Sequence, residues 1–435
     1  MRENGSRSEG GGGRGTVSLP PYFRHNFAAL LVDYVFFGVA FSFVNPSAVL
    51  PAFVRTLTDS EPLVGLVGTV LNGGWLLPQL GAAAMMGRRS RRKPYLMAGV
   101  YVGRPLFFLL ALAAWGGLAR HPGPMLGVFF ACVGLFTMTD SVASVAWFDI
   151  MARAVPLARR GRLVGAGQLL SSLLGIGVGA LVGLILDTPH LPYPANYALL
   201  FTLAGVAFLP STIALSLVRE PEGAREEPRR SLLDFLGQLG GVWREDRNFR
   251  RLVAHRWLVG LVGLSLPFFV LHATEVVGLP EAATGWFVSA QMAGGIIASL
   301  GFGWLSERKG PRPVIWLGSA AVLAMPLLAL TIHFVPVAWL VWAYPLVYFL
   351  AGLMNSSAML GPTNYLLEIA PDERRPLYVG LSNTLQGLLV PTSFVGGVVL
   401  RATSYPVLFG LTAAGVAAGV WMGLRIEELR REGTA

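Results

Sequence analysis

Three ionisable residues fall well inside long apolar stretches of the sequence: Asp33, Arg104 and Asp140. Each would cost at least ~2.5 kcal/mol at the centre of a membrane unless it is solvated or paired. At 1.5 Å per helical residue, Asp33 lies about 10 Å from the start of its stretch, and the other two lie about 14 Å from the nearer ends of theirs. The shared depth predicts one charge cluster.

Such a cluster could do two kinds of work. An arginine between two carboxylates would neutralise one of them and leave the other able to take up a proton, which would couple proton flow to solute movement. The alternative is a static ion pair that holds helices together. His272, near the outer end of its apolar stretch, titrates in a useful range, but we expect an ordinary interfacial histidine there.

The composition indicates the environment that these charges occupy. Of the 435 residues, 54% are hydrophobic and only 13% are charged, against roughly 25% charged in an average soluble domain. The single cysteine, Cys132, and six histidines without ligand spacing predict no disulfide, no metal site and no cofactor. We find no catalytic constellation at membrane depth and predict that the protein is not an enzyme.

Twelve stretches of the sequence are long and apolar enough to cross a bilayer as helices. They are 27–53, 62–86, 95–115, 124–149, 163–186, 198–218, 252–273, 283–305, 313–333, 337–362, 377–400 and 405–424. Most connections between them are short, so consecutive helices are expected to run antiparallel.

The charge distribution orients these helices. Although the net charge is +10, 30 of the 34 Lys and Arg residues fall on the side of the N-terminus, and only Arg55, Arg120 and Arg401 fall in loops on the other. The positive-inside rule then predicts a multi-pass protein of the cytoplasmic (inner) membrane with both termini in the cytoplasm. The lipid bilayer, and not a nucleic acid, is the partner that this charge implies.

The sequence predicts two helical halves joined by a charged segment. We expect a disordered cytoplasmic tail at 1–24, six helices within 25–218, a linker with an amphipathic helix at 219–251, six helices within 252–424, and a cytoplasmic tail at 425–435. This division requires an even number of membrane passes.

The two halves also resemble each other in sequence. The segment 154–165 recurs at 369–380, and the segment 89–94 recurs at 308–313. Both offsets are close to half the chain, which indicates parallel duplication of a six-helix unit. Repeats of this kind place a substrate site between the halves, near the middle of the membrane.

Glycine and proline mark places where the predicted helices pack or bend. Gly175, Gly179 and Gly183 recur at every fourth position of the fifth stretch and predict close helix packing. Pro46, Pro326 and Pro391 lie inside other stretches and permit kinks.

A loop between the eighth and ninth stretches carries a recognisable spacing. Gly303, Glu307, Arg308, Gly310 and Arg312 follow the pattern GxxxDRxGxR, with Glu in place of Asp. This loop resembles the cytoplasmic signature of the major facilitator superfamily of secondary transporters. The resemblance covers the whole membrane region and implies an all-α membrane fold of twelve transmembrane helices in two pseudo-symmetric six-helix bundles.

The resemblance also implies a cytoplasmic gate, in which the loop acid and arginine lock helix ends when the carrier faces outward. Asp149 is the candidate partner of Arg89, and Glu368 is the candidate partner of Arg308 or Arg312. In the first half a basic residue replaces the loop acid, which weakens that lock. The alternative is that these are interfacial charges serving topology alone.

Family architecture places the first, fourth, seventh and tenth helices around a cavity, with Arg104 reaching in from the third. The candidate cavity residues, spaced to share one helix face, are Thr137, Ser144 and Trp147 on the fourth helix, and Tyr344, Tyr348 and Asn355 on the tenth. The alternative for these side chains is hydrogen bonding between packed helices.

Together these features predict a monomeric secondary active transporter. It would move a small amphipathic or cationic solute across the cytoplasmic membrane by alternating access, as a proton-coupled antiporter working in efflux, because buried carboxylates select against anions. A lipid or organic-anion carrier anchored by Arg104 and a transport-inactive membrane sensor are the alternatives.

Overall fold

The computed structural model describes residues 20–86, 90–221, 241–335, 337–371 and 374–427, and these residues form helices and turns without a strand. Eleven of the helical segments are long and apolar enough to cross a membrane. The prediction of an all-α polytopic membrane protein is therefore confirmed.

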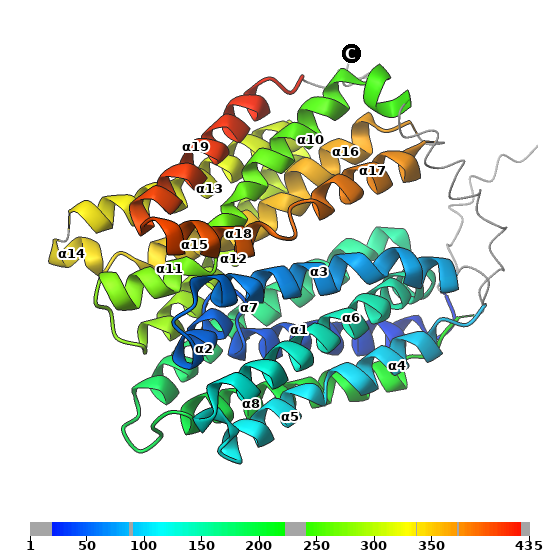
Figure 1. Ribbon diagram of the computed structural model, residues 1–435. Helices are drawn as coiled ribbons and strands as arrows, with labels where there is room; N and C mark the ends of the chain where they lie inside the picture. Colours follow the sequence, from blue (N-terminus) through cyan, green and yellow to red (C-terminus); the bar gives the residue numbers. More distant parts are fainter. Residues whose placement is uncertain (1–19, 87–89, 222–240, 336, 372–373, 428–435) are drawn as a thin grey trace, which may run out of the picture.

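The helices form two groups in space (Figure 1), with the earlier residues in one and the later residues in the other. The first group contains α1 (Phe23–Phe43), α2 (Val49–Leu57), α3 (Glu61–Met86), α4 (Lys93–Gly103), α5 (Leu106–Trp115), η1 (Leu118–Arg120), α6 (Pro122–Ala154), α7 (Leu157–Asp187) and α8 (Ala195–Leu217). The second group contains α10 (Arg247–Gly260), η2 (Leu261–Leu264), α11 (Phe268–Leu271), η3 (His272–Val276), α12 (Ala283–Lys309), α13 (Pro311–Phe334), α14 (Ala338–Val341), α15 (Pro345–Ala358), η4 (Met359–Thr363), α16 (Asn364–Ile369), α17 (Arg375–Gly387), α18 (Thr392–Ala402) and α19 (Tyr405–Leu424).

Helix α3 supplies a further membrane pass. It is 26 residues long and packs between α6 and α18. With α3 included, the described residues make the twelve passes that the sequence predicts, and the linker helix predicted within 219–251 falls largely outside the described residues.

Several passes are broken near prolines, which cannot donate a backbone hydrogen bond to the helix. The first pass stops at Phe43 and resumes at Val49, around Pro46. The third stops at Gly103, before Pro105, and the eleventh is interrupted ahead of Pro391. Sequence periodicity located these passes but predicted each as one continuous helix.

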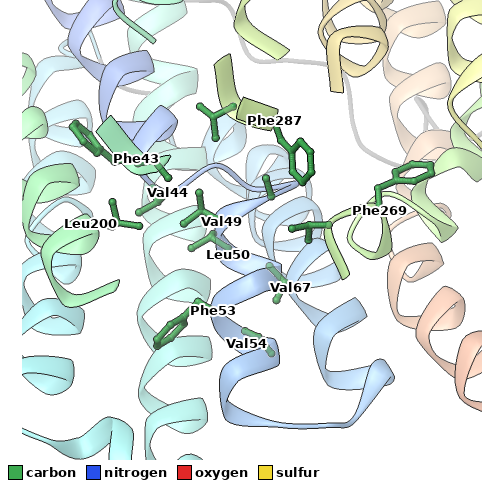
Figure 2. Close-up of a cluster of buried hydrophobic side chains, with 14 of the residues drawn as sticks. Phe43, Val44, Val49, Leu50, Phe53, Val54, Val67, Leu200, Phe269 and Phe287 are labelled. Carbon is green, nitrogen blue, oxygen red and sulfur yellow. The ribbon is translucent and has the colours of Figure 1, made fainter. Parts of the chain in front are cut away.

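The buried apolar side chains show how the two groups meet. The largest core joins residues of both groups around α2. Figure 2 shows Phe53 on this helix and Phe43 at the end of α1, with Phe269 and Phe287 approaching from the second group. Two further cores, one around Ile150 and one around Tyr365, each belong to a single group. We call the side of the shared core the distal side, and the side where α1 begins and α19 ends the terminal side.

Glycines allow the close approach of the groups on the distal side. A Cβ on Gly179 of α7 would lie 2.2 Å from Oγ of Ser289 on α12, and one on Gly285 would lie 2.3 Å from the Gly179 carbonyl oxygen. Nearer the terminal side, Gly165 of α7 and Gly303 of α12 face open space. The two groups are thus closed against each other on the distal side and separate on the terminal side.

Candidate functional site

A cavity of about 560 Å³ lies between the two groups of helices. Its volume falls within the range of pockets that bind small molecules. Its walls carry aromatic rings, a few amides and hydroxyls, and three ionisable side chains. The ionisable side chains are Asp33, Arg104 and Asp140.

Asp33 and Arg104 form a buried ion pair within the first group. Nη2 of Arg104 lies 3.0 Å from Oδ1 of Asp33, and each side chain is only 7% exposed. Ser211 donates a second hydrogen bond to Oδ1 at 2.5 Å, and the Trp147 indole donates one to Oδ2 at 2.8 Å. Arg104 therefore neutralises the Asp33 carboxylate, and Ser211 and Trp147 satisfy its oxygens with hydrogen bonds.

The remaining contacts of Arg104 also lie within the first group. Its Nη1 donates to the Thr212 hydroxyl at 3.1 Å, and its guanidinium carbon lies 5.5 Å from the Phe208 ring centroid and 6.0 Å from that of Phe37. Aromatic faces attract a cation at such distances. Arg104 directly follows α4, where Pro105 interrupts the third pass.

Asp140 differs from Asp33 although both line the cavity. It lies on α6, and among the described residues its carboxyl makes no hydrogen bond and no ion pair within 4 Å. The charges of Arg104 and Asp33 are close enough to act on it. The sequence-predicted cluster thus lines one cavity, with one carboxylate neutralised and the other open to it.

The predicted cavity residues on the fourth and tenth passes divide into two sets. Ser144, Trp147 and Asn355 line the cavity. Thr137 does not, because it lies further toward the distal side, where its hydroxyl donates to the carbonyl oxygens of Val133 and Gly134 at 3.0 Å.

The two tyrosines of the tenth pass also lie outside the cavity. Tyr344 is fully buried; its hydroxyl donates to the Phe269 carbonyl at 2.9 Å and lies 3.0 Å from Nδ1 of His272. Tyr348 stacks on Phe287 with ring centroids 4.5 Å apart. His272 itself is buried rather than interfacial, which corrects the expectation from the sequence.

The distal end of the cavity is closed by amides and a hydroxyl from both groups. Gln291 of α12 accepts a hydrogen bond through Oε1 from Nδ2 of Asn45 at 2.8 Å. The Ser47 hydroxyl shares its one proton between Oδ1 of Asn45 at 2.9 Å and Oε1 of Gln291 at 3.2 Å. The Asn45 carbonyl in turn accepts from the backbone N–H groups of Ser47 and Ala48. The sequence favours a helix-to-helix hydrogen bond for Gln291 but gives no sign of Asn45 and Ser47, whose places depend on the break between α1 and α2.

An aromatic face of α1 was also missed. Tyr34, Phe37 and Phe41 all line the cavity. Their spacing of three and four residues is the helical signal that could have found them. Tyr34 also donates to Gln168 of α7 at 3.2 Å.

On the terminal side, the first-half gate residue Asp149 pairs within its own group. Nε of Arg92 lies 3.0 Å from its carboxylate, and Arg153 contacts the same oxygen. Glu220 accepts from the backbone N–H groups of Arg92 and Lys93 at the start of α4. The expected partner, Arg89, lies outside the described residues.

The second-half loop forms the turn between α12 and α13. Gly303 lies in the last part of α12, and Gly310 ends that helix with a φ of 80°, a conformation that glycine adopts readily. Glu307 is exposed and makes no hydrogen bond or ion pair with described residues. The Arg308 guanidinium lies over the Trp304 ring, 4.7 Å from its centroid.

The other two gate candidates lie at helix ends of the second group. The guanidinium of Arg312 lies over the Trp316 ring at 4.6 Å. Glu368 lies in the last turn of α16. The guanidinium groups of this loop thus stack on tryptophan rings of α12 and α13.

The fold and cavity are those of a membrane transport protein with a central solute site between two related helical halves. A family model of the major facilitator superfamily matches residues 30–389 and 256–434, and the chain belongs to that family. It is accordingly a transporter of small molecules and not an enzyme.

Relatives in sequence are distant. An uncharacterised protein of Mycobacterium tuberculosis (strain ATCC 25618 / H37Rv) is 24% identical over 411 residues, which cover 92% of this chain and 77% of that protein. An uncharacterised protein of Mycobacterium bovis (strain ATCC BAA-935 / AF2122/97) matches with the same identity and coverage.

Solved structures share the fold at low identity. The nucleoside transporter NupG has a TM-score of 0.65 at 12% identity, covering 93% of this chain and 99% of its own. A bacterial homologue of the iron transporter ferroportin gives 0.68 in an inward-facing state, at 14% identity and 93% and 98% coverage. A structure with that description in an outward-facing state gives 0.61, at 15% identity and the same coverage.

Proposed function

We propose that the protein is a proton-coupled secondary transporter that exports a small, partly apolar cation. The observation that carries this proposal is the contrast between the two cavity carboxyl groups. Asp33 is paired with Arg104 and accepts from Ser211 and Trp147, whereas Asp140 faces the cavity with no hydrogen bond or ion pair among the described residues. A carboxylate placed in this way can hold either a proton or a cationic solute.

The remaining walls suit the apolar part of such a solute. Trp75, Trp147 and Phe148 line the cavity around the first group, and Met292 and Met354 face them from the second. Aromatic faces attract cations, and methionine adapts to irregular apolar shapes. An amphipathic cation is therefore the substrate class that the lining favours.

Exchange follows from competition for one site. A proton and a cation cannot both occupy the Asp140 carboxylate, so each displaces the other as the cavity opens to one side and then to the other. Such competition couples the two movements in opposite directions.

The alternative of an anion carrier anchored by Arg104 is not favoured. Asp33 and Thr212 occupy the guanidinium, and the Phe37 and Phe208 rings flank it. An anion would have to displace the Asp33 carboxylate before it could bind Arg104.

We further propose that the terminal side faces the cytoplasm, because 30 of the 34 basic residues lie there by sequence. The protein would then be an inner-membrane protein in an inward-facing state. The higher TM-score of the inward-facing ferroportin homologue supports this assignment, as does Glu307, which is exposed and has no hydrogen bond or ion pair with the described residues.

The gate on the terminal side would close when the cavity turns outward, with Glu307 then bound by a neighbouring helix. We also propose a monomer, because one chain encloses the whole cavity. The boundaries of the halves at 25–218 and 252–424 and of the linker at 219–251 belong to the same proposal.

The proposal is tested with purified protein in liposomes carrying an imposed pH gradient, with ethidium and tetraphenylphosphonium as amphipathic cation probes. Gradient-driven movement of either probe by the wild-type chain is expected. Asp140→Asn is expected to abolish it, because an amide can neither take up a proton nor attract a cation.

Asp187→Asn is the matched control, since that aspartate is exposed at the distal end of α7. Its transport rate should equal that of the wild type. Transport by Asp140→Asn at the wild-type rate, with the same response to the pH gradient, would overturn the proposed role of Asp140.

A further inference from the structure

A second pocket lies outside the central cavity, at the terminal ends of α1 and α7. Its volume is about 240 Å³, and it is lined by Phe23, Arg24 and Phe27 of α1 together with Arg159 and Arg162 of α7. Three guanidinium groups and two aromatic rings thus enclose a space that the transport proposal does not use.

The three arginines are distinguished from their neighbours by their lack of partners. Arg153 binds Asp149, and Arg160 donates to the carbonyl oxygens of Ala152 and Val155 at the end of α6. Within the described part of the chain, the side chains of Arg24, Arg159 and Arg162 make no hydrogen bond and no ion pair.

The remaining contacts of these arginines leave their hydrogen-bond donors unused. The Arg159 guanidinium lies 4.8 Å from the centroid of the Phe23 ring. Stacking of this kind fixes the plane of a guanidinium while its N–H groups stay available. The spacing of Arg159 and Arg162 by three residues places both on the same face of α7.

The surrounding backbone adds to the positive potential. Both α1 and α7 begin at this pocket, and neither has an acidic residue in its first turn or a side-chain cap. Helix N-termini carry partial positive charge. The local charge is therefore uncompensated among the described residues, which favours an anion, and phosphate matches the guanidinium fork.

The pocket also changes character along α1. Phe27 lies one turn, about 6 Å, further along the helix than Phe23, toward the apolar centre of the bundle. The Arg24 and Arg159 guanidinium groups near the helix ends and the Phe27 ring deeper in α1 match a phosphate head with acyl chains beside the ring.

We propose that this pocket binds the phosphate headgroup of an anionic phospholipid from the terminal-side leaflet. Basic pockets between helix ends are known to bind such headgroups, with each arginine contributing roughly a fivefold gain in affinity. The site is independent of the role of Asp140, so it stands even where no cation is transported.

The test measures lipid binding to the purified full chain by native mass spectrometry in neutral detergent. Dioleoyl phosphatidylglycerol is the anionic probe, and dioleoyl phosphatidylcholine is the neutral one. Arg159→Gln together with Arg162→Gln should weaken phosphatidylglycerol binding about 25-fold and leave phosphatidylcholine binding unchanged.

The matched control removes two other exposed arginines on the terminal side, through Arg91→Gln and Arg244→Gln. This control changes the net charge equally and should keep wild-type affinity. Arg159→Lys with Arg162→Lys should retain most of the binding, which would separate loss of charge from loss of folding.

Two outcomes would overturn the proposal. One is equal phosphatidylglycerol affinity in the pocket double variant and in the control double variant. The other is competition by inorganic phosphate at the same concentration as the lipid, which would show a site for a free anion and not for a lipid.

Discussion

The two groups of helices share one architecture but give the cavity different walls. The first group supplies all three ionisable side chains of the lining: Asp33, Arg104 and Asp140. The second group supplies only neutral ones: Leu266, Gln291, Met292, Met354 and Asn355. The chemistry of the cavity wall therefore differs between the two groups.

The two walls also differ in their hydrogen bonds, which stay within one group at Asp33 and join the two groups at Gln291. Every donor to Asp33 belongs to the first group, so the buried charge stays satisfied when the groups move relative to each other. Gln291, in contrast, accepts from Asn45 and Ser47 across the boundary. The first group thus carries the paired Asp33 within itself, whereas Gln291 of the second group holds the two groups together on the distal side.

The largest expected effect comes from breaking the charged unit of the first group. Asp33→Asn leaves Arg104 buried without its counter-charge, which should lower the free energy of unfolding by about 3–5 kcal/mol. Denaturant unfolding of the purified protein in detergent measures this change. Adding Arg104→Met to the same chain should restore most of the loss; a single variant within about 1 kcal/mol of wild type would contradict the assignment.

An intermediate effect is expected from removing the Gln291 amide, on the neutral cavity wall of the second group. Gln291→Leu removes the hydrogen bond from Asn45 and the shared one from Ser47, together about 1.5 kcal/mol, which should favour opening on the distal side roughly tenfold. The measurement is the labelling rate of Ser42→Cys, in a Cys132→Ser background, by a maleimide supplied from the distal side.

Ser299→Ala is the control for this variant, since the Ser299 hydroxyl bonds Ser356 within the second group. It should leave the labelling rate unchanged. If Gln291→Leu labels no faster than this control, the amide cluster does not hold the distal side closed.

The smallest effect is expected at a pair that joins the groups near solvent. Arg55 lies 2.5 Å from Glu275, and their side chains are 25% and 34% exposed. Partly exposed pairs contribute about 0.5 kcal/mol, so Arg55→Gln should raise distal labelling only about twofold. The difference should vanish at high salt.

Arg401→Gln is the control for this variant. If Arg55→Gln raised distal labelling as much as Gln291→Leu does, the ion pair would close the distal side as strongly as the amide cluster does.

The sequence predicts the passes of this molecule because hydropathy depends on local composition. It also predicts that Asp33, Arg104 and Asp140 share a depth, since the rise of a helix is constant. The helix breaks beside Pro46 and Pro105 are harder to predict from the sequence, because neighbouring helices decide whether a proline bends a helix or ends it.

Helical periodicity identifies the face of a residue but not the depth at which the cavity ends. Thr137 shares a helix with Ser144, and Tyr348 shares one with Asn355, yet only Ser144 and Asn355 line the cavity. The shared core closes the two groups at the level of Thr137 and Tyr348. That closure depends on contacts between distant segments, which no single helix encodes.

The hydrogen-bond partners of the charged residues could not be predicted either, because they too come from distant segments of the chain. Ser211 donates to Asp33 from a helix 178 positions further along the chain. A lone serine in an apolar stretch gives no sign of such a role. The arginine could be paired with an aspartate by depth alone, whereas the serine could not.

The position of Gln291 also sets a minimum length for a solute that is to be transported. Its amide is part of the cavity lining and part of the distal closure at once. A solute held at Asp140 disturbs that closure only if its far end reaches the amide. We therefore expect short cations to occupy the cavity as inhibitors and longer ones to be carried, so that the protein distinguishes its cargo by reach as well as by charge.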